Sequence, residues 1–323
     1  MHIARHLAAI AFSALAAVPT AQGAQPAFPD RPIRLIIGSA PGSGPDIIAR
    51  LVADHLYGVW NTRVVVDSRP GVAGAISAEL AARANPDGYT WLMLTSQLFV
   101  ATAVYPDLKF DLDKDFVSMV LIGVVPYVLM VNPQVPAKSV TELIALAKKS
   151  PGKLKYGSAG AGGGEHITTV LFERMTGTSM LHVPYKGIPQ ALLDAIAGEV
   201  QFAFPVYPAA RPHIDSGRLR PFGVTGQKRA PGLPDVPAIA EVVPGFWNVG
   251  WYSIVAPKGS PQAILVKAAE EVVKATREPA FGEKLKTLGV EIAAGGPKEL
   301  DAFRASERKR LTELVKASGI KIQ

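Results

Sequence analysis

The stretch IRLIIGSAPGSGPDIIARL, Ile33–Leu51, decides the fold: it predicts a strand, a glycine-rich turn and a helix. Gly42 and Gly44 permit positive φ and a close approach of the backbone to a ligand. Pro45 fits the first helical turn, and Asp46 can accept hydrogen bonds from the free N–H groups there. Those N–H groups and the helix dipole favour a carboxylate or phosphate, although a tight turn without any ligand uses the same residue types.

A second unit of this kind lies in the other half of the chain. LKYGSAGAGGGEHITTVLFERM, residues 154–175, has five glycines between Gly157 and Gly164, more than a connection needs. They leave a run of bare N–H groups before a helix that begins near Glu165. Two such loops facing each other across a cleft could hold a dianion, or the two ends of one ligand.

Around these units, strand-like runs alternate with helix-like segments such as Val140–Lys149 and Gln190–Ala197. This alternation predicts βαβ units and mainly parallel sheets. The run VLIGVVPYVLMVN, residues 120–132, predicts a single strand. The last seventy or so residues are mostly helical, and the proline-rich residues 231–248 predict an ordered loop crossing between two lobes.

The N-terminus predicts a secretory signal peptide, residues 1–23. It has a basic start at Arg5, an apolar run from Leu7 to Val18, and small residues at Ala21 and Gly23. That run is too short for a stable membrane anchor, the alternative interpretation. We therefore expect a periplasmic protein. The absence of cysteine removes both disulfides and a lipid anchor, and the scattered Lys and Arg behind the net charge of +7 argue against nucleic-acid binding.

The residue spacing in the sequence does not match several known catalytic and cofactor-binding motifs. Neither loop matches a P-loop or the complete G-x-G-x-x-G of a dinucleotide site, and no G-x-S-x-G elbow occurs. The histidines after the signal peptide, residues 55, 166, 182 and 213, lack metal-ligand spacing. We therefore expect no enzyme, no cofactor and no metal.

The chain resembles the periplasmic solute receptors of tripartite tricarboxylate transporters, the Bug family. The resemblance rests on FPDRPIRLII (28–37), APGSGPDIIARL (40–51), VVDSRPGVAGAISAELAARANPDGYT (65–90), KSPGKLKYGSAG (149–160), HVPYKG (182–187) and ARPHIDSGRLRPFGVTG (210–226). YPDLKFDLDKDF (105–116) and LPDVPAIAE (233–241) complete it, so the matching blocks cover nearly the whole chain after the signal peptide.

The resemblance implies an α/β fold, the two-lobed periplasmic-binding-protein type II fold with a ligand cleft between lobes. Lobe one would comprise residues 27–125 plus 250–323, and lobe two residues 126–249. It also implies a small carboxylate ligand, membrane transporter subunits as partners, and a monomer. The expected ligand-binding residues are Ser39, Ala40, Pro41, Gly42, Ser43, Gly44, Asp46, Ser96, Gln97, Ser158, Ala159, Gly160, Gly162, Gly163, Gly164, His166, Phe204, Pro205 and Tyr207.

Departures from the family pattern bear on the ligand. Gly38-Ser39 replaces the usual Pro-Phe, Gly163-Gly164 replaces two serines, and Pro205 stands where an Asp is common. These changes leave the expected pocket with more room and with one carboxylate fewer. We therefore expect a dicarboxylate, bulky or aromatic, with Phe204 or Tyr207 lining its apolar middle. The other hypothesis is ordinary drift around a citrate-like or C4 acid. Lys186 is either a counter-ion or a turn residue.

The function we expect is ligand capture without chemistry, followed by delivery to a membrane transporter. Lobe closure would complete the site, because each lobe supplies one loop. A sensory receptor acting on a membrane kinase would use the same closure, so the sequence leaves both roles open. An α/β periplasmic enzyme would need a nucleophile–base pair or a metal, and neither pattern occurs.

Overall fold

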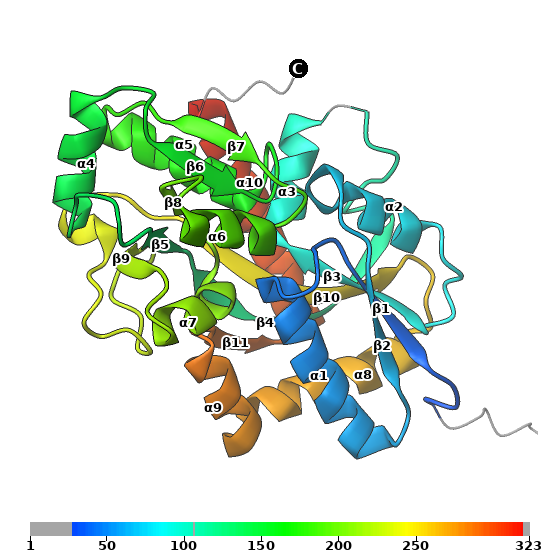
Figure 1. The fold of residues 1–323 in the computed structure, drawn as a ribbon. Helices are drawn as coiled ribbons and strands as arrows, with labels where there is room; N and C mark the ends of the chain where they lie inside the picture. Colours follow the sequence, from blue (N-terminus) through cyan, green and yellow to red (C-terminus); the bar gives the residue numbers. More distant parts are fainter. Residues whose placement is uncertain (1–27, 106, 319–323) are drawn as a thin grey trace, which may run out of the picture.

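The computed structural model describes residues 28–105 and 107–318, so the predicted signal peptide lies outside the described residues. The chain forms two mixed sheets, each packed between helices (Figure 1). Among the described helices, none combines the length and the apolar composition required to cross a bilayer.

The first sheet has six strands in the order β11-β4-β10-β3-β1-β2. Its strands are β1 (Ile33–Ile37), β2 (Val64–Ser68), β3 (Thr90–Thr95), β4 (Phe116–Pro126), β10 (Val249–Pro257) and β11 (Glu291–Gly295). Helices α1 (Gly44–Trp60) and α8 (Gln262–Arg277) pack on one face, with α9 (Pro279–Thr287) beyond them. The other face carries η1 (Val72–Gly74), α2 (Ala75–Ala82), α3 (Ser96–Val104) and α10 (Pro297–Ser318).

The second sheet has five strands in the order β7-β6-β8-β5-β9. They are β5 (Val128–Val131), β6 (Lys155–Ser158), β7 (Leu181–Pro184), β8 (Phe202–Ala203) and β9 (Arg220–Val224). The segments between them form α4 (Val140–Lys149), α5 (Gly164–Thr176), α6 (Ile188–Ala197), α7 (Tyr207–Asp215) and the short η2 (Ile239–Glu241).

Strand β1 shows why the first sheet is covered on both faces. Leu35 and Ile37 belong to the core beneath α1 and α8, whereas Ile36 belongs to the core beneath α2, α3 and α10. All three side chains are fully buried. Since successive strand residues point to opposite faces, a continuous apolar run requires helices on both sides.

The expectation of mainly parallel sheets was wrong. Strand β1 runs parallel to β2 and β3, and β6 runs parallel to β7 and β8. All other pairings are antiparallel, namely β10–β3, β10–β4, β11–β4, β5–β8 and β5–β9. The reason is that β4, β5 and β10 adjoin the passages between sheets, so they do not arise from helical crossovers within one sheet.

The run 120–132 is likewise two strands rather than the single strand predicted. Strand β4 ends at Pro126 and β5 begins at Val128, in the other sheet. Tyr127 links them, and its backbone N–H donates to Thr225 Oγ1 at 2.9 Å. The chain returns to the first sheet after residues 231–248, which contain only the short helix η2. Helices α3 and α7 were not predicted from the sequence.

Gly289 shows how tightly α7 packs against the C-terminal part of the chain, and it gives a stability test. Its φ is +71°, and a Cβ there would overlap the ring of Tyr207. Gly177 has a similar φ, +64°, with open space around the Cβ position. We expect Gly177→Ala to lower the free energy of unfolding by about 1–2 kcal/mol through backbone strain alone. Gly289→Ala should lower the free energy of unfolding by at least about 2 kcal/mol more than Gly177→Ala does. If urea denaturation shows equal losses for the two variants, this packing is contradicted.

Candidate functional site

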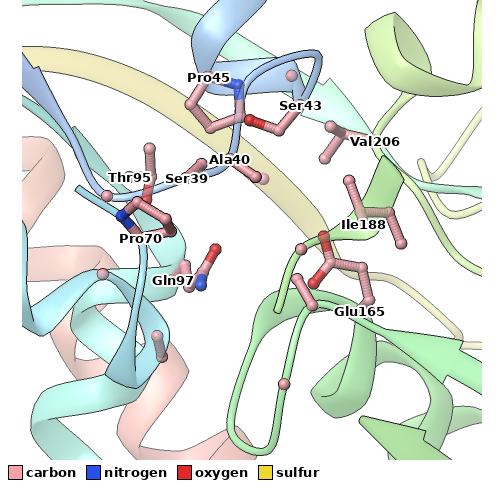
Figure 2. Close-up of a pocket in the computed structure, with 18 of the residues that line it drawn as sticks. Ser39, Ala40, Ser43, Pro45, Pro70, Thr95, Gln97, Glu165, Ile188 and Val206 are labelled. Atoms are coloured by element: carbon pink, nitrogen blue, oxygen red, sulfur yellow. The ribbon is translucent and has the colours of Figure 1, made fainter. Parts of the chain in front are cut away.

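A cavity with a volume of about 420 Å³ lies between the two sheets. Both glycine loops border it: the β1–α1 loop from the first sheet and the β6–α5 loop from the second. Figure 2 shows Gln97 and Glu165 pointing into this space from opposite sides. The two loops predicted from sequence therefore do face each other.

In the first loop, Ser43 is the N-cap residue of α1, and its N–H donates to Ala40 O at 3.1 Å. The Gly42 N–H donates to the Asp46 carboxylate at 2.9 Å. Asp46 is buried and also pairs with Arg50, so it anchors the loop. As in any helix, the first N–H groups of α1 have no partner within the helix.

The second loop repeats this hydrogen-bond pattern residue by residue. The Gly163 N–H donates to Gly160 O at 3.2 Å, as Ser43 does to Ala40 in the first loop. The Gly162 N–H donates to His166 Nδ1 at 3.0 Å, so the imidazole takes the place of the Asp46 carboxylate. Gly42 and Gly162 both adopt left-handed backbone, with φ of +79° and +73°. The two loops are conformational equivalents.

A tyrosine hydroxyl packs against the first residue of each helix. A Cβ at Gly44 would lie 2.5 Å from Tyr252 Oη, and a Cβ at Gly164 would overlap Tyr127 Oη. Tyr252 belongs to β10, and Tyr127 links β4 to β5. The segments that pass between the sheets therefore contact the helix N-termini directly, and glycine is required at both places.

The His166 ring is held from behind by His182, which stacks on it at 4.0 Å between centroids. Ser158 Oγ hydrogen-bonds His182 Nε2 at 2.6 Å, and Tyr156 stacks on His182 at 5.0 Å between centroids. Burial lowers the pKa of both histidines to about 4. A neutral His166 is what the loop needs, since Nδ1 must accept the Gly162 N–H.

Glu165 follows the glycine run and brings a carboxyl group to the cavity wall. The residue is 6% exposed, and its Oε2 has no hydrogen-bond partner. Burial raises its pKa to about 7, although the backbone N–H groups of Ala159 and of Glu165 itself act in the opposite direction. Among the ion pairs of the described residues, none includes Glu165.

Two hydroxyl groups on the cavity wall share this lack of partners. They are Ser43 Oγ and Tyr252 Oη, on residues 4% and 2% exposed. Ser43 is an N-cap whose side chain does not cap its helix. Buried polar groups are normally satisfied, so three unpartnered ones on a single cavity indicate a polar ligand.

The structure brings some of the sequence-predicted residues to the cavity wall. Those that line it are Ser39, Ala40, Ser43, Gly44, Ser96, Gln97, Ala159 and Gly160. Others belong to the two strand–loop–helix units without lining the cavity: Pro41, Gly42, Asp46, Ser158, Gly162, Gly163, Gly164 and His166.

Phe204, Pro205 and Tyr207 need a correction, because they do not line the cavity. Phe204 is fully buried against Phe172 and Phe202 in the core of the second sheet. Tyr207 is fully buried and donates its hydroxyl to Gly232 O at 2.9 Å. In this segment it is the neighbouring Val206 that reaches the cavity. Neither aromatic ring can form the apolar wall that we assigned to it.

The apolar wall comes instead from aromatic residues that the sequence analysis did not single out. They are Tyr105, Tyr127, Tyr185, Trp251 and Tyr252. A third glycine-containing loop, residues 70–74, also lines the cavity, with Val72 and Ala73 at φ of +47° and +50°. Its two glycines after a predicted strand were a usable sequence pattern. Lys186 lines the cavity as well.

Another group of titratable side chains lies outside the cavity. His55 of α1 faces Glu271 of α8 at 3.7 Å, and its other ring nitrogen lies 4.0 Å from Glu278. Such a set could in principle ligate a metal ion. Lys274, however, places its ammonium group 3.8 Å from the same Glu271 oxygen. We therefore interpret the group as polar contacts that join α1 to the α8–α9 corner.

Comparison with protein families gives one match over most of the chain. Residues 48–320 match the model of the tripartite tricarboxylate transporter family receptor. The chain is also similar to the protein BugT of Bordetella pertussis, at 31% identity over 326 residues and the full length of both chains.

Two solved structures are similar in both fold and sequence. One is R. palustris Rpa4515 with adipate, with a TM-score of 0.89 and 33% identity, covering 91% of this chain and 99% of that one. The other is MatC (Rpa3494) from Rhodopseudomonas palustris with bound malate, with a TM-score of 0.83 and 26% identity. That match covers 89% of this chain and all of MatC.

The raised pKa of Glu165 predicts how stability depends on pH. Its protonated form is favoured in the folded state, so its contribution is complete below the unfolded pKa of about 4.5 and is lost as pH rises through about 7. Relative to Glu165→Gln, the wild type should lose about 3 kcal/mol of unfolding free energy between pH 4.5 and pH 8.5. The exposed Glu270→Gln variant should follow the wild type. Parallel curves for wild type and Glu165→Gln in urea denaturation would contradict the burial of an unpaired carboxyl.

Proposed function

Because the chain belongs to the tripartite tricarboxylate transporter receptor family, we propose that it captures a dicarboxylate in the periplasm and delivers it to a membrane transporter. It acts as a monomeric carrier, and the cavity between the two sheets is its binding site. The receptor family and the periplasmic binding proteins among its structural neighbours support this role.

The observation that carries the proposal is the pair of equivalent loops. Each presents the N-terminus of a helix to the same cavity, and helix N-termini favour anions through their free N–H groups and dipoles. The unpartnered hydroxyls of Ser43 and Tyr252 add two donors. A small molecule with carboxylates at both ends matches two anion-binding ends in one cavity.

The size of the cavity bears on which dicarboxylate is bound. Rpa4515 was solved with adipate and MatC with malate, so relatives hold both C6 and C4 diacids. About 420 Å³ lies within the range typical of drug-sized ligands. Tyr105, Tyr185 and Trp251 supply apolar walls for a longer or aromatic middle. We favour a bulky diacid for this reason, with a C4 acid as the alternative.

Capture closes two lobes, residues 27–125 plus 250–323 and residues 126–249. Two contacts between the sheets support this. Tyr105 Oη donates to Ala161 O at 3.1 Å, joining α3 to the second loop. A Cβ at Gly187 would lie only 2.7 Å from the Cβ of Ala40, so Gly187 permits close approach of the first loop to the α6 N-terminus. The transporter then recognises the surface of the closed form.

The class of ligand can be tested directly. Protein lacking the predicted signal peptide should be stabilised by at least one of the diacids malate, adipate and phthalate or by the triacid citrate, and not by the corresponding methyl esters. At a thousand times its Kd, the ligand should add about 4 kcal/mol, raising Tm by several degrees. Thermal unfolding followed by calorimetric titration measures this. If none of the four acids binds, the proposed function is wrong; if only malate or citrate binds, the bulky-ligand choice is wrong.

Ser43 provides a test with an internal control. Its hydroxyl is unpartnered in the free protein, so Ser43→Ala should change the free energy of unfolding by less than about 0.5 kcal/mol. Loss of a hydrogen bond to a charged ligand should weaken diacid binding about 10- to 100-fold. Ser139, a true N-cap that accepts from the Glu142 N–H, is the matched control. Ser139→Ala should cost about 1 kcal/mol of stability without affecting affinity. The reverse pattern would remove Ser43 from the binding site.

A further inference from the structure

Glu165 presents a chemical conflict at the proposed site. The three unpartnered groups on the cavity wall are two hydroxyls and one carboxyl. The hydroxyls of Ser43 and Tyr252 can donate to an anion, but an ionised carboxylate can only accept. Glu165 lines the cavity and its buried Oε2 has no partner, so an ionised Glu165 would repel the very ligand that the loops attract.

The groups that face Glu165 from neighbouring elements do not compensate its charge. Tyr127 and Tyr252 are buried, and burial keeps both phenols neutral by raising their pKa. His166, next on α5, is neutral at pH 7 because burial lowers its pKa to about 4. The backbone N–H groups of Ala159 and of Glu165 itself also act on the carboxyl, but they carry no net charge.

Charged groups farther away are engaged elsewhere or make no ion pair with it. Arg310 of α10 acts on Tyr127 but is paired with Glu307 at 2.6 Å. Lys186, before α6, lines the same cavity, yet no ion pair between its ammonium group and Glu165 occurs in the described residues. The conflict therefore has to be resolved at Glu165 itself.

We propose that Glu165 holds a proton whenever the cleft holds its diacid, and that Oε2–H donates a hydrogen bond to a carboxylate oxygen of the ligand. The inference rests on the proposed function, because it requires a carboxylate ligand. The proton comes from solvent and returns there on release, so no covalent step is involved. Protonation converts a like-charge repulsion into a charge-assisted hydrogen bond.

This role also defines what the site selects. A ligand with an ammonium group next to Glu165 would favour the ionised carboxylate, whereas a second carboxylate favours the protonated acid. Because the pKa of free Glu165 is about 7, protonation near neutral pH requires little free energy. Glu165 is thus a specificity residue for diacids over zwitterions, and it couples capture to proton uptake.

The test is calorimetric titration of the protein with the tightest-binding diacid of malate, adipate and phthalate, in buffers of different ionisation enthalpy. The wild type should take up about 0.9 proton per diacid at pH 8 and about 0.1 at pH 6, given a free pKa of about 7. Its affinity should fall about eightfold between pH 7.5 and pH 8.5. Glu165→Gln retains an N–H donor and should bind with no proton uptake and with constant affinity from pH 6 to pH 9.

Glu173→Gln is the matched control, because Glu173 lies on the same helix, is partly buried with a raised pKa, and does not line the cavity. This variant should take up protons as the wild type does.

If the wild type binds a diacid with no proton uptake, the inference is overturned and the proposed function stands. Proton release, with affinity rising with pH, would instead show an ionised Glu165 facing a cationic group. If no diacid binds the wild type between pH 5.5 and pH 9, the proposed function itself fails. The wild-type measurement decides even if Glu165→Gln does not fold.

Discussion

The contact between a tyrosine hydroxyl and the first glycine of a helix is the constraint on which the site depends. Tyr252 packs on Gly44 and Tyr127 packs on Gly164. Both tyrosines lie in or beside strands that adjoin the passages between sheets, and both are buried. The helix N-termini are thereby fixed relative to those passages. Any rotation of one sheet against the other must move the loop N–H groups with it, which is the coupling a closing receptor needs.

The two loops share one backbone conformation but carry different side chains at equivalent positions. Asp46 and His166 occupy equivalent positions and accept equivalent N–H groups, from Gly42 and Gly162. A carboxylate serves in the first loop because Arg50 balances its charge. A neutral imidazole serves in the second, where no such partner is found among the described residues. The second loop thus adds no fixed negative charge of its own, apart from Glu165.

The sequence analysis was correct for structural features that depend on residues close together in the chain. The strand, glycine loop and helix around Gly42 and around Gly162 were correct because turn geometry and helix starts depend on neighbouring residues. Tertiary packing decided the rest. Phe204 and Tyr207 stand beside a departure from the family pattern and were therefore assigned to the pocket. In the structure Phe204 packs in the aromatic core of the second sheet, and Tyr207 is buried with its hydroxyl bonded to Gly232 O. Helix α7, with Pro208 and Pro212, resists prediction because its residues favour turns locally.

Glu165 escaped sequence analysis for a related reason, since a carboxyl at a helix start normally faces solvent and stabilises the dipole. Here Gly163 and Gly164, without side chains, let Tyr127 and the loop backbone close around it. Burial without a cation costs stability when the group ionises, and the backbone N–H groups of Ala159 and Glu165 offset only part of that cost. Loop N–H groups bind one carboxylate much as another, so they discriminate poorly between diacids and amino acids. A carboxyl poised between its two protonation states discriminates between them by charge, and its instability in the empty cleft follows from that role.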